Sequence, residues 1–105
     1  MSTVRITAVR RTEYPDLMER YELPLEDACS IQVGQTFLTD GQRPEGLCES
    51  AWETLRPFVE HLASGGEKIY GDWMKNPRSA LLSCNDGFRP VSFYLEALDN
   101  EEKNP

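Results

Sequence analysis

The longest helical repeat of apolar residues in the chain runs from Leu47 to Ala63. Apolar side chains recur there every three or four residues, the spacing that places them along one face of an α-helix. This face comprises Cys48, Ala51, Trp52, Leu55, Val59, Leu62 and Ala63. Pro57 falls nearly opposite it, so the pattern predicts one long helix, bent at the proline, whose buried stripe begins at Cys48.

Other segments have the two-residue alternation, or the β-branched and aromatic content, that is typical of strands. They are residues 3–10, 31–40, 79–84 and 89–98. Asp86 and Gly87 separate the last two, and this pair is a strong hairpin signal because both residues tolerate positive φ. A short helix is predicted from Tyr14 to Tyr21, where Pro15 occupies the first helical position.

The predicted order of elements is strand, helix, strand, helix, strand, strand. The final hairpin must be antiparallel, and the long helix can bury its apolar stripe most simply by covering one face of a sheet. The sequence therefore predicts a single α+β domain over residues 1–98, in which a small, mostly antiparallel sheet of about four strands packs against one long helix. Residues 99–105 form a polar C-terminal tail.

The net charge of the chain limits the classes of partner that we expect for this protein. The chain of 105 residues has 11 Lys and Arg against 18 Asp and Glu, a net charge of -7, whereas nucleic-acid binding normally needs a clustered basic face. No segment has the apolar core of a signal peptide or approaches the roughly 20 apolar residues of a membrane span. We therefore expect a cytoplasmic protein with no nucleic-acid or membrane partner, which binds a small molecule, another protein or further copies of itself.

Acidic residues recur every four positions at the start of the long helix. They are Glu45, Glu49 and Glu53. Near the positive end of the helix dipole such a row is favourable, and the pattern indicates a solvated acidic face.

The three cysteines, Cys29, Cys48 and Cys84, fall at predicted element boundaries, where loops can converge. An odd number without close spacing fits reduced thiols. Cys48 opens the long helix, whose dipole favours the thiolate. If the three sulfurs meet, they could hold zinc or iron with His61, Asp86 or water as a fourth ligand. Since no C-x2-C pair is present, buried structural thiols and no cofactor are the commoner arrangement.

Aromatic and charged residues add further candidates. Trp52 is predicted in the core, while Trp73 lies in a long connection and either covers a pocket or simply packs. Asp86 and Arg89 flank the hairpin turn, where they either pair with each other or present a guanidinium to an anionic ligand. The candidate ligand-binding residues are thus Cys48, Trp52, Trp73, Asp86 and Arg89.

Three segments carry a resemblance to a known family. Pro44–Trp52, Trp73–Lys75 and Cys84–Val91 read PEGLCESAW, WMK and CNDGFRPV. They resemble a family of small, functionally uncharacterised prokaryotic proteins with P-E-G-x-C-x-x-A-W, W-M and C-C-x-D-G-x-R-P-V. The resemblance covers most of residues 3–97 and implies no activity. Where the family has two adjacent cysteines, this chain has Ser83 and Cys84.

The function predicted from the sequence is that of a small cytoplasmic ligand-binding or accessory module. Its pocket would be bounded by the cysteine-bearing ends, Trp73 and the turn from Asp86 to Arg89. Two alternatives stay open. One is a thiol-dependent enzyme or a cysteine-ligated zinc or iron protein centred on Cys48, and the other is a purely structural subunit of a homo-oligomer.

Overall fold

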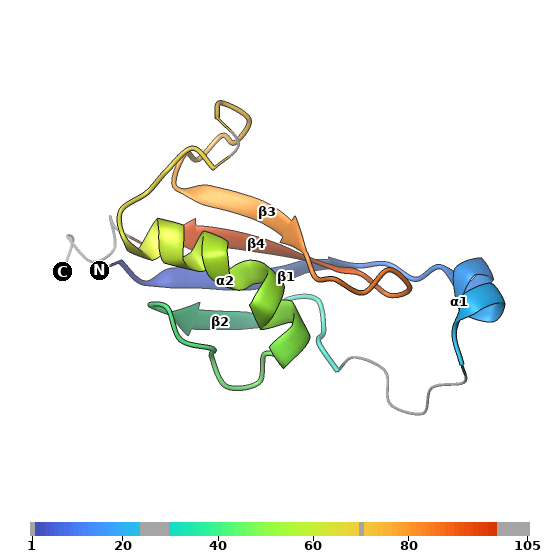
Figure 1. Ribbon diagram of the computed structural model, residues 1–105. Coiled ribbons are helices and arrows are strands. Elements are labelled where there is room, and N and C mark those ends of the chain that lie inside the picture. Colours follow the sequence, from blue (N-terminus) through green and yellow to red (C-terminus); the bar gives the residue numbers. More distant parts are fainter. Residues whose placement is uncertain (1, 24–29, 70, 99–105) are drawn as a thin grey trace.

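The computed structural model describes residues 2–23, 30–69 and 71–98, and it confirms the α+β prediction. The elements are β1 (Val4–Arg11), α1 (Pro15–Tyr21), β2 (Thr36–Thr39), α2 (Glu49–Ala63), β3 (Ser79–Ser83) and β4 (Val91–Ala97). The strands form a four-stranded sheet of order β2-β1-β4-β3, in which every neighbouring pair is antiparallel. Helix α2 lies across one face of this sheet (Figure 1). The tail over 99–105 lies outside the described residues.

The core is built on the two central strands. Val4, Ile6 and Ala8 of β1 are fully buried and alternate with half-exposed residues. Ile6 is paired with Phe37 of β2 on one side and with Leu95 of β4 on the other. Directly opposed residues of an antiparallel ladder point to the same face, so these side chains form one apolar surface beneath α2.

Helix α2 presents to the sheet the stripe that its spacing predicts. Its buried residues are Ala51, Trp52, Leu55, Val59, Leu62 and Ala63. The prediction was wrong for Cys48, whose side chain is exposed. Cys48 is the N-cap, with extended backbone (φ -66°, ψ 152°), so its side chain leaves the chain before the helical repeat begins. Leu47 is buried in its place.

The second strand is shorter than the predicted 31–40. Its first half is a turn, in which the Gln35 N–H donates to the Gln32 carbonyl at 3.1 Å. Gly34 within the turn has φ +99°, a left-handed conformation that favours glycine. The β-branched and aromatic content of this segment did not reveal the reversal, because composition alone says nothing about backbone direction.

Helix α1 is attached at the end of the sheet and buries none of its own residues. Figure 1 shows it beside the connection between β3 and β4. The Thr12 N–H donates to the Pro90 carbonyl at 3.0 Å, and the Tyr14 N–H donates to the Phe88 carbonyl at 2.9 Å. The β1 strand thus continues along that connection until α1 begins. No helix in the described ranges is long and apolar enough to cross a membrane.

Candidate functional site: a charged groove along helix α2

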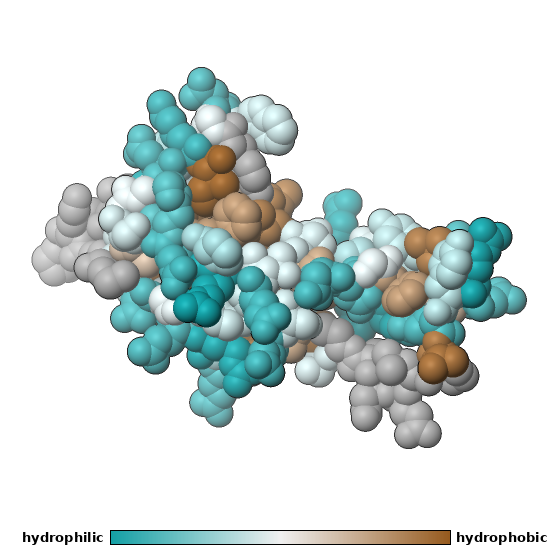
Figure 2. All heavy atoms as spheres, viewed as in Figure 1, coloured by the Kyte–Doolittle hydropathy of each residue, from teal (hydrophilic) through white to brown (hydrophobic). Residues whose placement is uncertain are grey.

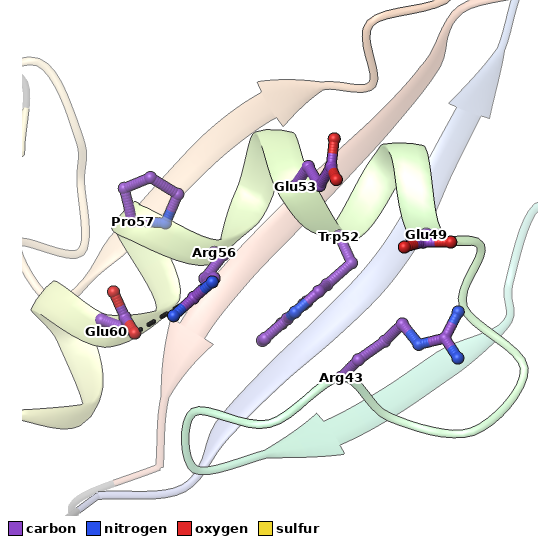
Figure 3. Close-up of a pocket in the computed structure, with 7 residues that line it drawn as sticks. All are labelled: Arg43, Glu49, Trp52, Glu53, Arg56, Pro57 and Glu60. Atoms are coloured by element: carbon purple, nitrogen blue, oxygen red, sulfur yellow. Dashed lines mark hydrogen bonds and ion pairs between the residues drawn. The ribbon is translucent and has the colours of Figure 1, made fainter.

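A groove of about 750 Å³ runs between α2 and the loop over residues 40–47 (Figure 3). It is lined by Arg43, Glu49, Trp52, Glu53, Arg56, Pro57 and Glu60. Its volume lies within the range of small-molecule sites, although most of its lining is polar, whereas such sites are usually mostly apolar.

The loop that carries Arg43 is anchored at both ends. At its start, the buried Thr39 hydroxyl accepts a hydrogen bond from the Gly41 N–H at 3.0 Å and donates to the Gln42 carbonyl. At its end, Gly46 has φ +90° and Leu47 is buried in the core. Because both ends are fixed, the backbone of this loop is in place beside α2 before any ligand arrives.

The helix wall carries acidic and basic side chains from successive turns of α2. Arg56 Nε lies 3.3 Å from Glu60 Oε2, an exposed pair four residues apart. Arg43, Glu49 and Glu53 form no ion pair with any residue in the described part of the chain. In Figure 3 the Arg43 guanidinium points toward the Glu49 end of the helix. The unpaired charges of the groove are therefore gathered at one end.

Trp52 belongs both to the core and to the groove. It is 8% exposed and packs within the apolar cluster above the sheet, as predicted. Its exposed part lines the groove, where Figure 3 shows the indole reaching from α2 toward the Arg43 loop. The rim of the indole thus gives this polar groove an apolar contact surface.

The described cysteines have separate surroundings. Cys48 Sγ lies 3.8 Å from Ser50 Oγ at the start of α2. Cys84 is half-buried against the core, and its sulfur accepts a hydrogen bond from the Val91 N–H at 3.3 Å. Across residues 2–23, 30–69 and 71–98 no group of three or more His, Cys, Asp or Glu side chains could hold a metal ion. Cys29 lies outside these residues, so the three-sulfur zinc or iron site stays a prediction.

Asp86 and Arg89 stabilise the end of the molecule at which α1 is attached. Asp86 Oδ1 accepts hydrogen bonds from the N–H groups of Phe88 (2.8 Å) and Arg89 (3.1 Å), which fixes the turn. The Arg89 guanidinium donates to both carboxylate oxygens of Glu22, at 3.0 and 2.8 Å. Its partner is thus Glu22, just after α1, and its guanidinium is already engaged by a carboxylate.

The ion pair between Arg89 and Glu22 is well shielded from solvent, with side chains 13% and 16% exposed. The hydrogen bonds that Arg89 donates to the Glu22 carboxylate are the main cause that raises the pKa of Arg89 above its ordinary value, against the opposing effect of desolvation. The guanidinium therefore keeps its charge, and the pair stays intact on the arginine side, throughout the neutral range.

Trp73 is 83% exposed in the connection between α2 and β3. Figure 1 shows this connection projecting on the β3 side of the molecule, whereas the Arg43 loop lies on the β2 side. Of the predicted ligand-binding residues, only Trp52 lines the groove. The sequence indicates an acidic face at Glu49 and Glu53, but no local pattern marks Arg43. Arg43 comes to lie beside α2 only when its loop folds against the helix.

A second hollow of about 310 Å³ lies on the other side of Pro57. It is lined by Pro57, Phe58, His61, Glu67, Lys68 and Ile69. Figure 2 shows an apolar area here beside the mainly hydrophilic surface of α2. His61 Nε2 lies 3.2 Å from the Glu67 carbonyl, so the imidazole helps to hold the connection against α2. These contacts favour a packing role for this region.

The fold and the groove define a small α+β domain with a charged groove along its helix. Comparison of the chain with protein-family models, with curated proteins and with solved structures found no match. The resemblance carried by Pro44–Trp52 and Cys84–Val91 stays a prediction. Any function must therefore be argued from the site itself.

Proposed function

We propose that the protein is a small cytoplasmic ligand-binding or accessory module, and that the groove along α2 is its binding site. One observation carries this proposal. Arg43 faces α2 across a groove of about 750 Å³, and neither it nor Glu49 has an ionic partner among the described residues. Charged side chains collected in a concave site are available to a ligand, whereas those already paired within the protein are not.

The anchoring of the groove supports the same proposal. The Thr39 hydrogen bonds and the buried Leu47 hold the Arg43 loop, while Trp52 and Leu55 fix α2 to the sheet. A site whose walls are already ordered loses less conformational entropy on binding. The backbone on both sides of the groove is therefore ordered before a ligand binds.

A fragment screen followed by ¹H–¹⁵N NMR tests this function. We expect ligands to shift the Trp52 indole N–H and the backbone amides of Gln42 and Arg43. The Arg43→Gln variant should weaken binding, whereas Arg10→Gln, a matched change on an exposed β1 residue, should not. Hits that shift only residues outside the groove, or a screen without hits, would contradict the proposal.

Thiol chemistry at Cys48 is a second candidate function, favoured by the exposure of its side chain at the first turn of α2. The positive end of a helix dipole favours a thiolate. If this function holds, iodoacetamide should alkylate Cys48 faster than it alkylates N-acetylcysteine at the same neutral pH. Equal or slower alkylation would exclude it, and elemental analysis of protein purified without chelator tests the zinc or iron alternative.

A further inference from the structure

The two walls of the groove carry charges of opposite sign. Arg43 supplies the positive wall from the 40–47 loop, while Glu49 supplies the negative wall from the first turn of α2, and Glu53 adds a further negative charge at the far edge of the helix. Figure 3 shows the guanidinium of Arg43 and the carboxylate of Glu49 on facing sides, with the Trp52 indole between the helix and the loop. A molecule seated at this end of the groove would lie beside both signs of charge.

The far end of the groove is electrically balanced. Arg56 and Glu60 pair with each other at 3.3 Å, so neither presents a full net charge to a ligand. Neither Arg43, Glu49 nor Glu53 has such a partner among residues 2–23, 30–69 and 71–98. The charge that distinguishes one ligand from another is therefore concentrated between Arg43 and the first turns of α2.

We infer that the groove binds a small zwitterion that carries an ammonium and a carboxylate, as amino acids and short peptides do. This inference rests on the proposed function of the groove as a binding site. The ligand carboxylate is matched to the planar fork of Arg43, and its ammonium to the carboxylate of Glu49. Its apolar portion contacts the exposed rim of Trp52.

Charge selection follows from the same arrangement. A simple anion would gain the contact with Arg43 but would be repelled by Glu49. A simple cation would gain the acidic wall but would be repelled by Arg43. Unfavourable contacts of this kind discriminate between ligands as effectively as favourable ones.

Titration of the ¹⁵N-labelled full chain with matched probes tests the inference. The zwitterions are L-leucine and glycyl-L-leucine. L-leucine methyl ester lacks the carboxylate, and N-acetyl-L-leucine lacks the ammonium. We expect both zwitterions to shift the Trp52 indole N–H and the Arg43 amide, and the two singly charged probes to bind about tenfold more weakly or worse, because each lacks one charge-assisted contact.

Removing a charge from either wall of the groove should weaken zwitterion binding in the same way as removing a charge from the ligand. Arg43→Gln and Glu49→Gln are each expected to raise the Kd for the zwitterions about tenfold. Glu45→Gln removes the same charge from an exposed neighbour that does not line the groove, and it should leave the Kd unchanged. Unaltered spectra for β1 and β4 show that each variant is folded.

The inference is overturned if neither zwitterion shifts a groove resonance at up to about 10 mM, a concentration that reveals even millimolar affinity. It is equally overturned if the singly charged probes bind as well as the zwitterions. If another compound from the fragment screen shifts the groove while the zwitterions do not, the ligand class is wrong and the proposed function stands. If no compound shifts the groove, both fail.

Discussion

The two helices of this protein are held in opposite ways. Helix α2 buries six residues against the sheet, among them Leu55, Val59 and Leu62. Helix α1 buries none and is held by backbone hydrogen bonds around Tyr14 and by the ion pair between Glu22 and Arg89. One attachment is apolar and extends over a whole helix face, whereas the other depends on a few polar contacts.

Because of this difference, contacts under α2 should determine the stability of the whole domain, whereas contacts at α1 should determine only the local order of that helix. Removal of an apolar contact under α2 should destabilise the whole domain, because the core is shared by every strand of the sheet. Removal of a polar contact at α1 should release that end while the core persists, since local openings cost less than global unfolding. The groove lies along α2, the helix that is packed on the core.

The largest effect is expected for Leu55→Ala, which creates a cavity between α2 and the sheet. Leu55 is fully buried, so the free energy of unfolding should fall by about 2–5 kcal/mol. Chemical denaturation measures this loss. Leu23→Ala, at an exposed position after α1, is the matched control and should change stability by less than about 0.5 kcal/mol. Similar losses of unfolding free energy for both variants would contradict the different attachment of α2 and α1.

Arg89→Gln should release α1 with a smaller global effect than Leu55→Ala. The substitution leaves the Glu22 carboxylate without its bidentate partner in a shielded site. Native-state hydrogen exchange should accelerate over residues 16–22 and remain unchanged in α2. Arg10→Gln, the same change at an exposed residue of β1, is the control. Equal acceleration in both helices would contradict separate attachment.

The pH dependence of this pair follows from the raised pKa of Arg89. A group whose pKa is raised on folding contributes stability that is complete below its unfolded pKa and is lost as the pH rises through the folded value. For an arginine both values lie far above neutrality. Exchange protection of α1, corrected for intrinsic rates, should therefore show no loss from Arg89 titration between about pH 6 and pH 9.

Asp86→Ala should destabilise the β3–β4 connection moderately. It removes the acceptor of two backbone N–H groups, and each lost hydrogen bond contributes about 1 kcal/mol. Asp86→Asn keeps an acceptor oxygen and should retain most of the stability. Thermal unfolding compares the two variants. If the asparagine variant loses as much as the alanine variant, the side chain acts through its charge rather than through the turn.

Among the substitutions that remove a contact, the smallest effect is expected for Glu96→Gln on the sheet. Glu96 pairs with Arg5 across β1 and β4 at 3.3 Å, and both side chains are more exposed than those of the Glu22–Arg89 pair. Cross-strand pairs of this kind contribute about 0.2–1 kcal/mol, and salt screens them. Denaturation at low and high salt should show a small loss that shrinks with salt. A loss of stability equal to that of Arg89→Gln would contradict the expected difference between the Arg5–Glu96 and Glu22–Arg89 ion pairs.

The elements with strong local patterns could be predicted from the sequence. The stripe from Ala51 to Ala63, the alternation in β1 and β4 and the proline at the start of α1 each specify one structure locally. The turn at Gln32–Gln35 could not, because its β-branched and aromatic surroundings are equally typical of a strand. Cys48 was misplaced because a cap residue follows no helical repeat.

The candidate site was harder to predict, since its parts are distant in the sequence or play structural roles. Asp86 and Arg89 have the residue types of a binding site, yet they stabilise a turn and the attachment of α1. Arg43 carries no motif and gains its place only when its loop folds against α2. Trp52 alone was identified both from its spacing and as a candidate binding residue.

The central claim is that ligands bind in the groove and leave the α1 end unaffected. A single titration of the ¹⁵N-labelled chain with glycyl-L-leucine measures both regions at once. The proposed binding site predicts saturable shifts at the Trp52 indole N–H and the Arg43 amide, with none at Phe88 or Arg89. Shifts confined to Phe88 and Arg89, or none at Trp52 and Arg43, would contradict it.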